Sequence, residues 1–323
     1  MKLKYGEAIR QALQAELESD PKVVLMGQDV QHNIYGYTGE LMRTFGSRRV
    51  RNTPISEAAV VGTAIGSAMC GLRPILDLTV ANFLYIAMDQ LASMAAKTRY
   101  MYDGQFKVPM TILVGTLYNT NSAAQHSDRP HPAIMNIPGL KAIAPASPQD
   151  AYSMLRSAVR DDNPVVCFMD RNLFYSEEDV DENRIVPLGK AALLSVGGGI
   201  TIVSVGGATK IVLEALPELA EKGVSAEVID VRSLAPLDFE TISSSVKKTG
   251  RVVIVDTANR TCSAASEISA RLAEKEFASL RAPIGIVAYD DVPVPFAKCL
   301  ERQIMPTKDK VLSKVLHTIC YGK

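Results

Sequence analysis

Neither sign of charge is in excess in this sequence. Lys and Arg together number 35, as do Asp and Glu, among the 323 residues. This balance leaves no basic stripe of the kind that nucleic-acid-binding proteins carry, so we expect no nucleic-acid partner.

Long apolar runs are also missing. No stretch reaches the roughly 18 apolar residues of a membrane-spanning helix, and the N-terminal residues lack the apolar core of a signal peptide.

The five cysteines are scattered, and no two of them form a CxxC pair. An odd, unpaired set argues against a disulfide framework and a zinc site, and it predicts reduced thiols and a cytoplasmic location.

Phosphate-binding fingerprints are missing too. The glycines of GGGITIVSVGGATK (197–210) match neither GxGxxG nor GxxxxGK[ST], and tight packing of a strand against a helix explains them equally well.

What the sequence does contain is a regular alternation of apolar strands and amphipathic helices. In the first half, the predicted strands cover 22–27, 73–78, 109–115, 140–145 and 164–169, with helices over 6–19, 57–71, 83–99 and 148–160. In the second half, strands are predicted at 199–207, 225–231, 251–256 and 282–289, with helices ending at 222, near 238–247, near 264–277 and over 308–319. Such alternation is typical of α/β proteins with parallel sheets.

An acidic, irregular stretch without a helical stripe separates the two halves. We therefore predict a first domain over residues 1–175, a linker over 176–195 and a second domain over 196–323.

Glu57 is the first candidate for chemistry. It follows NTPIS and falls in the first turn of the predicted helix 57–71, where Gly62 and Gly66 keep one helical face small. An acidic side chain in a first turn can also serve only to interact favourably with the helix dipole. A catalytic and a purely structural role for Glu57 therefore both stay open.

The segment AAQHSDRPHP (123–132) holds two of the four histidines, after the predicted strand 109–115. Loops beyond the carboxyl ends of parallel strands are where such sheets place their ligands, and histidine carries protons readily at neutral pH. His126 is the candidate for a catalytic role, although a surface histidine without any catalytic or binding role is an equal alternative. The spacing of His126 and His131 is not that of HExxH, so zinc is not expected.

A third candidate is RDDNPVV (160–166), a short turn before a strand. Its carboxylate, amide and backbone oxygens are the ligands of a hard cation, and they are equally the components of an ordinary Asx turn.

Several segments are long enough to be specific as a set: KYGEAIRQALQAEL, FGSRRVRNTPISEAAVVGTAIGSAMCGLRPI, FLYIAMDQLASMAAKTRYMYDGQFKVP, AAQHS, PGLKAIAPASPQDA, RDDNPVV, SAEVIDVRSLAPLDFETISSSVKKTGRVVIVD and DDVPVPFA. In order and spacing they resemble β subunits of pyruvate, branched-chain 2-oxo acid and acetoin dehydrogenases, which depend on thiamine diphosphate. The resemblance spans nearly the whole chain. It implies two three-layer α/β sandwiches with mostly parallel sheets, a pyrimidine-binding domain followed by a transketolase C-terminal-like domain.

The resemblance also assigns roles to residues. Glu57 would hydrogen-bond the aminopyrimidine ring of thiamine diphosphate, and His126 would act on the reaction intermediate or help pass on its acyl group. Four more residues would lie around the aminopyrimidine: Gln28, Val80, Ala81 and Phe83. Ala158, Asp161 and Asn163 match a site for a structural monovalent cation such as K⁺ in some relatives. The sequence departs from the family's usual aromatic residue near Val80 or Ala81, and its opening motif is GQD instead of GED.

One family motif is missing. Enzymes of this class hold the diphosphate through Mg²⁺ with a Gly-Asp-Gly motif, and the sequence has none. The resemblance therefore implies an α subunit that carries this motif, a second β subunit in an α2β2 heterotetramer, and a lipoyl-bearing acyltransferase that takes the acyl group of a 2-oxo acid.

Three alternatives stay open. Half of a split transketolase-like carboligase shares the domain pair but usually carries another acidic motif in place of ISEAAV. A non-catalytic assembly subunit would keep the fold and lose the chemistry, against which the presence of both Glu57 and His126 argues. The third alternative is a dinucleotide-binding dehydrogenase, and the absence of the GxGxxG fingerprint from the sequence argues against it.

Overall fold

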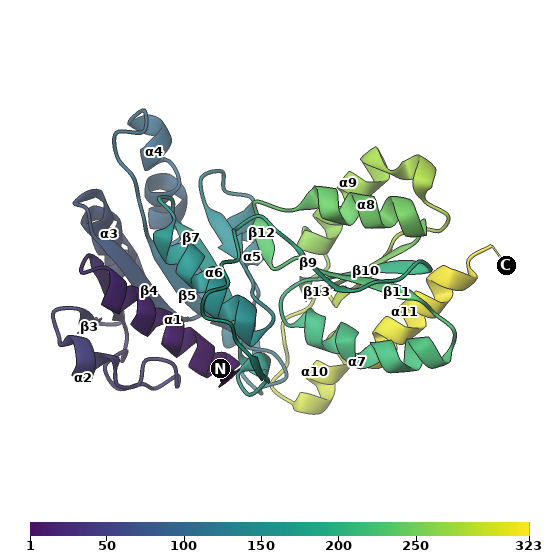
Figure 1. Cartoon of the computed structure of the whole chain (residues 1–323), viewed down its shortest axis with the longest axis horizontal. Helices are drawn as coiled ribbons and strands as arrows, with labels where there is room; N and C mark the ends of the chain where they lie inside the picture. Colours follow the sequence, from purple (N-terminus) through teal and green to yellow (C-terminus); the bar gives the residue numbers. More distant parts are fainter. Residues whose placement is uncertain (323) are drawn as a thin grey trace. The chain divides into compact units, whose positions relative to one another are not determined.

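Two separate sheets, each with parallel strands at its centre, organise the computed structural model, which describes residues 1–322 (Figure 1). The first structural unit comprises residues 1–117 and 133–188, and the second comprises residues 118–132 and the chain from Gly189 onward. The predicted α/β class with mostly parallel sheets is confirmed.

The first unit contains β1 (Lys2–Lys4), α1 (Tyr5–Ser19), β2 (Val23–Gly27), α2 (Leu41–Phe45), β3 (Val50–Asn52), α3 (Glu57–Met69), β4 (Arg73–Val80), η1 (Ala81–Tyr85), η2 (Gln90–Ala95), α4 (Thr98–Met101), β5 (Thr111–Thr116), β6 (Lys141–Ile143), α6 (Pro148–Arg160), β7 (Val165–Asp170), η4 (Arg171–Leu173) and β8 (Glu177–Asp179). Its main strands run in the order β6-β7-β5-β4-β2-β3, all parallel. A short α5 (His131–Met135) begins in the second unit and continues into the first.

The core of the first unit lies between this sheet and the helices α1 and α6. Val23 and Leu25 of β2 join the same buried cluster as Ile9 and Leu13 of α1 and Leu155 of α6. Alternate residues of a strand point to opposite faces, so the residues between them face the side that α3 covers. Helices on both faces explain why these strands are apolar throughout and not alternating.

One helix of the first unit differs from the prediction. The expected helix 83–99 is broken into η1, the π-helical η2 and the short α4. A Cβ atom on Gly62 of α3 would lie 3.3 Å from the side-chain oxygen of Gln90, so η2 packs closely on the small face of α3. Short π-helical stretches within a helical run are local packing features that propensity does not reveal.

The second unit contains η3 (Ala124–His126), β9 (Ala192–Ser195), β10 (Ile200–Ser204), α7 (Ala208–Glu221), β11 (Ala226–Asp230), β12 (Ser233–Ala235), α8 (Phe239–Thr249), β13 (Val252–Asn259), α9 (Ala264–Lys275), η5 (Phe277–Ser279), β14 (Gly285–Tyr289), α10 (Lys298–Ile304) and α11 (Lys308–Cys320). Its sheet has the order β14-β13-β10-β11-β9, with β9 antiparallel at one edge. Helices α7 and α11 lie on one face of this sheet, and α8 and α9 lie on the other (Figure 1).

The stretch expected to be a linker contains regular structure. Strand β8 pairs antiparallel with β1 at the start of the chain, and β9 joins the second sheet. These pairings attach residues on either side of Gly189 to different units.

Candidate active site

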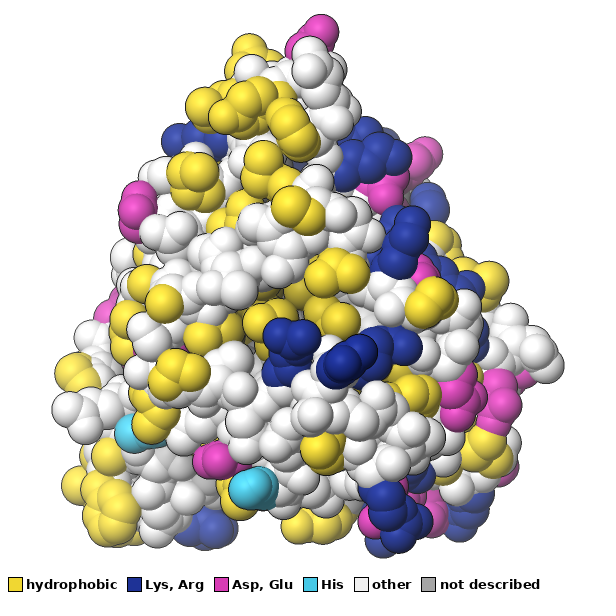
Figure 2. Space-filling model, turned by 90° about the vertical axis from the view of Figure 1, so that its left-hand side faces the viewer, with side chains coloured by type: hydrophobic (Ala, Val, Ile, Leu, Met, Phe, Trp, Pro, Cys, Tyr) yellow, Lys and Arg dark blue, Asp and Glu magenta, His cyan; other side chains and the backbone are white. Residues whose placement is uncertain are grey.

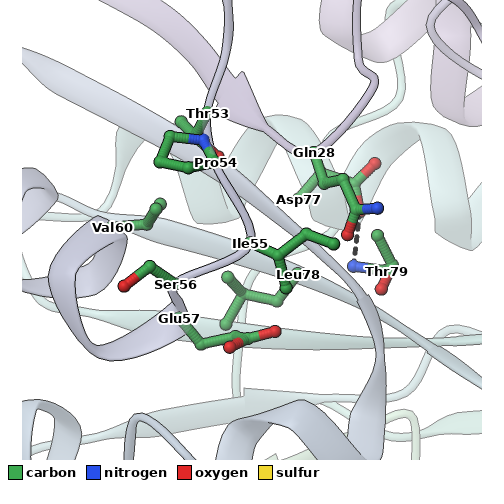
Figure 3. A pocket seen from close by; sticks show the side chains of 10 residues that line it. All are labelled: Gln28, Thr53, Pro54, Ile55, Ser56, Glu57, Val60, Asp77, Leu78 and Thr79. Atoms are coloured by element: carbon green, nitrogen blue, oxygen red, sulfur yellow. Dashed lines mark hydrogen bonds between the residues drawn. The ribbon is translucent and has the colours of Figure 1, made fainter.

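A small pocket in the first unit lies where β2, β3 and β4 end and α3 begins (Figure 3). Parallel α/β sheets bind their ligands at this edge, beyond the carboxyl ends of the strands. The residues that line the pocket are Gln28, Thr53, Pro54, Ile55, Ser56, Glu57, Val60, Asp77, Leu78 and Thr79. Two of the residues proposed from the sequence, Glu57 and Gln28, are therefore brought together.

Glu57 is the first residue of α3 and is only 9% exposed. Its carboxyl group points toward Leu78 and away from the hydroxyl of Ser56 (Figure 3). Within residues 1–322 no ion pair or side-chain hydrogen bond engages this carboxyl group. A largely buried carboxyl group at a helix N-terminus, without a protein partner, is suited to hydrogen-bond a ligand that enters the pocket.

Asp77 is a second carboxyl group in the same pocket, and the sequence reasoning missed it. One of its oxygens accepts the hydroxyl of Tyr37 at 2.8 Å, and the other accepts the backbone N–H of Thr79 at 2.8 Å. Burial raises the pKa of Asp77 from its usual 3.8 to about 6, although these hydrogen bonds and the charge of Arg171 oppose the rise. The available signal was an aspartate inside the otherwise apolar run PILDL (74–78).

Thr79 takes an unusual backbone conformation at this place. Its φ is +63°, which is rare for a β-branched residue, and the hydrogen bond to Asp77 holds the turn. The Thr79 hydroxyl is buried and has no hydrogen-bond partner among the described residues. The tight turn also requires Gly27, because a Cβ atom there would lie 2.4 Å from the carbonyl oxygen of Asp77.

The remaining residues proposed for the cofactor follow the pocket along the chain. Val80 ends β4 and is buried, Ala81 begins η1 and is fully buried, and Phe83 is half-buried in η1. They do not belong to the residues that line the pocket, which end at Thr79 on this strand. Contact of these three side chains with a cofactor stays a prediction.

His126 belongs to the second unit, in the segment 118–132. It ends the short η3 and is half-buried. The other histidine of this segment, His131, is buried and lies 3.2 Å from the carboxylate of Asp256. The two histidines therefore differ in burial: His131 lies in the interior of the second unit, and His126 is half-buried.

The residues proposed for a monovalent cation are engaged by cationic side chains. The carboxylate of Asp161 forms an ion pair with Lys141. Arg73 donates to the carbonyl oxygen of Asp161 at 3.1 Å, and the side-chain oxygen of Asn163 accepts from Arg99 at 2.8 Å. The carbonyl oxygen of Ala158 accepts the N–H of Asp161. As they stand, these oxygens do not fit K⁺, which would have to displace Lys141 and Arg73.

Residues 1–322 contain no cluster of three or more His, Cys, Asp or Glu side chains that could hold a metal ion. Over the same range, no helix has the length and apolar character needed to span a membrane.

Comparison with known proteins shows the family to which the chain with this pocket belongs. Residues 1–176 match the family model of the transketolase pyrimidine-binding domain, and residues 189–311 match that of the transketolase C-terminal domain. The chain is 38% identical to the acetoin:2,6-dichlorophenolindophenol oxidoreductase subunit β of Bacillus subtilis, over 98% of this chain and 97% of that protein. It is also 38% identical to the pyruvate dehydrogenase E1 component subunit β of Rickettsia bellii, over the full length of both.

The chain belongs to the transketolase-like E1 β-subunit family. Glu57 and its pocket lie in the part of this family member that matches the pyrimidine-binding domain, and the predicted resemblance is confirmed. The E1 β-type fold also occurs in a split-gene transketolase solved as an inactive β4 tetramer, with a TM-score of 0.82, 22% identity and 99% coverage of both chains. At that identity the likeness concerns the fold alone.

Proposed function

We propose that the chain is the β subunit of a thiamine-diphosphate-dependent enzyme that decarboxylates a 2-oxo acid, with an active site completed by an α subunit. The observation that carries the proposal is the Glu57 carboxyl group at the edge of a pyrimidine-binding domain, which is largely buried and has no ion-pair or side-chain partner among residues 1–322. The E1 β subunit of pyruvate dehydrogenase from Rickettsia bellii, similar over its full length, supports the reaction class.

The polar side chains that line the pocket offer the kinds of hydrogen-bond partner that an aminopyrimidine ring needs. The carboxyl group of Glu57 can share a proton with a ring nitrogen. The amide of Gln28 and the hydroxyl of Thr79, which has no hydrogen-bond partner in residues 1–322, offer further hydrogen bonds. Leu78 and Val60 supply apolar surface for the flat ring. When bound, thiamine diphosphate supplies the electron sink for the carbanion that decarboxylation leaves.

In this mechanism Glu57 holds and returns a proton at one carboxyl oxygen. Because its side chain is largely buried, bulk water does not compete for that hydrogen bond. Thr79 and Gln28 orient the ring edge. His126 is the proposed proton donor toward the substrate side, in agreement with its half-buried place at the end of η3 and with the usual role of imidazole in general acid–base catalysis.

The absence of Gly-Asp-Gly from the sequence supports a partner for the diphosphate and Mg²⁺. The first unit also exposes a set of large apolar side chains around α4: Tyr100 is 91% exposed and Met101 66%, and Tyr102 and Phe106 lie beside them. Figure 2 shows hydrophobic side chains gathered at the top of this face, where α4 lies in Figure 1. Exposed apolar patches of this kind mark protein interfaces. We assign this one to assembly with the α subunit or the second β subunit of an α2β2 heterotetramer.

Acetoin is a second candidate substrate. The Bacillus subtilis relative, named for acetoin, is as similar to the chain as the pyruvate dehydrogenase subunit. Both substrates contain a carbonyl carbon that could accept the nucleophilic carbon thiamine diphosphate would supply when bound. A lipoyl-bearing acyltransferase is the proposed acceptor in a 2-oxo acid complex.

Co-expression with an α subunit that carries Gly-Asp-Gly tests the proposal. The purified complex is assayed with 2,6-dichlorophenolindophenol as electron acceptor over a panel of 2-oxo acids and acetoin. We expect turnover of at least one 2-oxo acid, dependent on thiamine diphosphate and on both chains, whereas turnover of acetoin alone would support the second candidate. A complex that binds the cofactor and turns over no member of the panel would contradict the proposed reaction.

A further inference from the structure

The segment 118–132, which carries His126, is attached to the rest of the second unit by a buried cluster. Tyr118 of this segment packs with Tyr289, Val294 and Met305, and the two tyrosine rings meet edge to face with centroids 6.5 Å apart. At its other end, His131 contacts Asp256 in the interior. The position of His126 within the second unit therefore depends on what holds these two ends.

Arg129 lies inside the same cluster and is only 4% exposed. Its guanidinium carbon lies 3.9 Å from the centroid of the Tyr289 ring and 5.3 Å from that of the Tyr118 ring. None of its three side-chain nitrogens has a hydrogen-bond partner among the described residues. Cation–π contact favours this placement, but it is weak compared with the cost of removing a guanidinium ion from water.

A buried carboxylate compensates that charge. Glu301 of α10 is 1% exposed, and one of its oxygens accepts the backbone N–H of Asn119 at 2.5 Å and the hydroxyl of Tyr289 at 3.4 Å. Its other oxygen has no partner among the described residues. Arg129 thus lies on the ring of Tyr289 and Glu301 lies at its hydroxyl, so the two opposite charges flank one phenol.

Tyr289 can bridge the two charges only as a neutral phenol, which donates its proton to Glu301. Burial, the largest influence, raises the pKa of Tyr289 above its usual range, and the phenol therefore stays protonated at every working pH. Each charge alone would be a costly buried ion, whereas the pair is neutral as a whole.

We propose that Arg129 and Glu301 form a buried charge pair, bridged by Tyr289, that clamps the segment 118–132 and positions His126. Arg129 binds the segment's second half to the tyrosine, and Glu301 binds its beginning through Asn119. Both are positioning residues, because neither is placed on the substrate. The effect on turnover rests on the proposed function of His126, whereas the clamp itself does not.

A double-mutant cycle on the full chain tests the clamp. Arg129→Met and Glu301→Gln are made singly and together, and amide hydrogen exchange is measured over residues 119–129. Because each single variant removes one member of the pair and leaves the other buried charge without it, we expect exchange to rise about tenfold or more in each. In the double variant the increase should be smaller than the product of the two single increases. The matched controls Arg302→Met and Glu274→Gln, at exposed positions of the same unit, should leave exchange unchanged.

The conservative variant Arg129→Lys keeps the charge, so its increase in exchange should be smaller than that of Arg129→Met. This comparison decides the question even if one variant folds poorly. Single variants that match the controls, or effects that multiply without coupling in the double variant, would overturn the clamp.

A second readout links the clamp to His126. In the complex with the α subunit, Arg129→Met should lower kcat about tenfold while the Kd for thiamine diphosphate changes by less than about twofold, since the residue positions His126 and does not bind the cofactor. A matching loss of cofactor affinity would contradict the positioning role. If the wild-type complex turned over no substrate, the proposed function would fail, and the exchange experiment would still decide the clamp.

Discussion

Replacing Glu57 by Gln is expected to lower kcat/KM of the complex with the α subunit by about 10²- to 10⁴-fold, the usual contribution of a positioned proton donor or acceptor. Glutamine keeps the size of the side chain and can still hydrogen-bond a ring nitrogen, but it cannot give up and take back a proton at that atom. The measurement is the rate at which the cofactor's reactive carbon exchanges its proton with deuterium, together with substrate turnover. Both rates should fall together.

The control for Glu57→Gln is Glu240→Gln, which alters an exposed glutamate in the first turn of α8. Both substitutions remove an acidic group from a helix N-terminus, so a role limited to the helix dipole predicts the same small loss of stability, about 0.3–1 kcal/mol, and no loss of turnover in either. Full proton exchange in Glu57→Gln would show that the carboxyl group has only that role.

Replacing Asp77 by Asn is expected to change stability in a manner that depends strongly on pH. Burial raises the folded-state pKa of Asp77 to about 6, above its usual 3.8. The protonated Asp77 carboxyl group of the wild-type protein therefore stabilises the fold fully below pH 3.8, and this stabilisation is lost as the pH rises through 6. The loss amounts to about 3 kcal/mol, and Asn does not titrate. The free energy of unfolding of Asp77→Asn, relative to wild type, should increase by most of this amount, about 2 kcal/mol, between pH 4 and pH 7.

The variant Tyr37→Phe tests how the hydrogen bond from Tyr37 affects the pKa of Asp77. The hydroxyl of Tyr37 donates to Asp77 and lowers its pKa. Without that hydrogen bond the pKa of Asp77 should be higher still. The difference in unfolding free energy between Tyr37→Phe and Tyr37→Phe/Asp77→Asn should then begin at the same pH as in wild type, continue to a higher pH and become larger. Chemical denaturation over a series of buffers measures all four proteins. A difference between Asp77→Asn and wild type that is constant with pH would rule out a raised pKa.

The sequence was sufficient to place Glu57 at the start of a helix, because Pro54 and the polar residues around it mark that start, and the structure begins α3 at this residue. The role of Glu57 toward the cofactor stays a prediction. The alternation of apolar strands and helices likewise predicted the α/β class, and the structure confirms it. Both features are local, since each depends on residues within a few positions of one another. Gln28 was found only through the family resemblance, and the structure places it in the same pocket as Glu57.

The features that could not be predicted depend on contacts between distant residues or on strained backbone. Asp77 was overlooked because a strand pattern does not show that Tyr37, forty positions earlier, donates to it. The left-handed conformation of Thr79 contradicts the local preference of a β-branched residue. The pairing of Asn119 with Glu301 spans 182 positions, so nothing near residues 118–132 indicates that they belong to the second unit.

Titration calorimetry of thiamine diphosphate with Mg²⁺, into this chain alone and into its complex with an α subunit, tests most directly whether the cofactor is held by two chains. The pocket beside Glu57 holds only the aminopyrimidine end in our proposal, so the chain alone should bind roughly 10²-fold or more weakly than the complex, as expected when one of two linked contacts is missing. Equal affinity in the two titrations, with turnover by the chain alone, would contradict it.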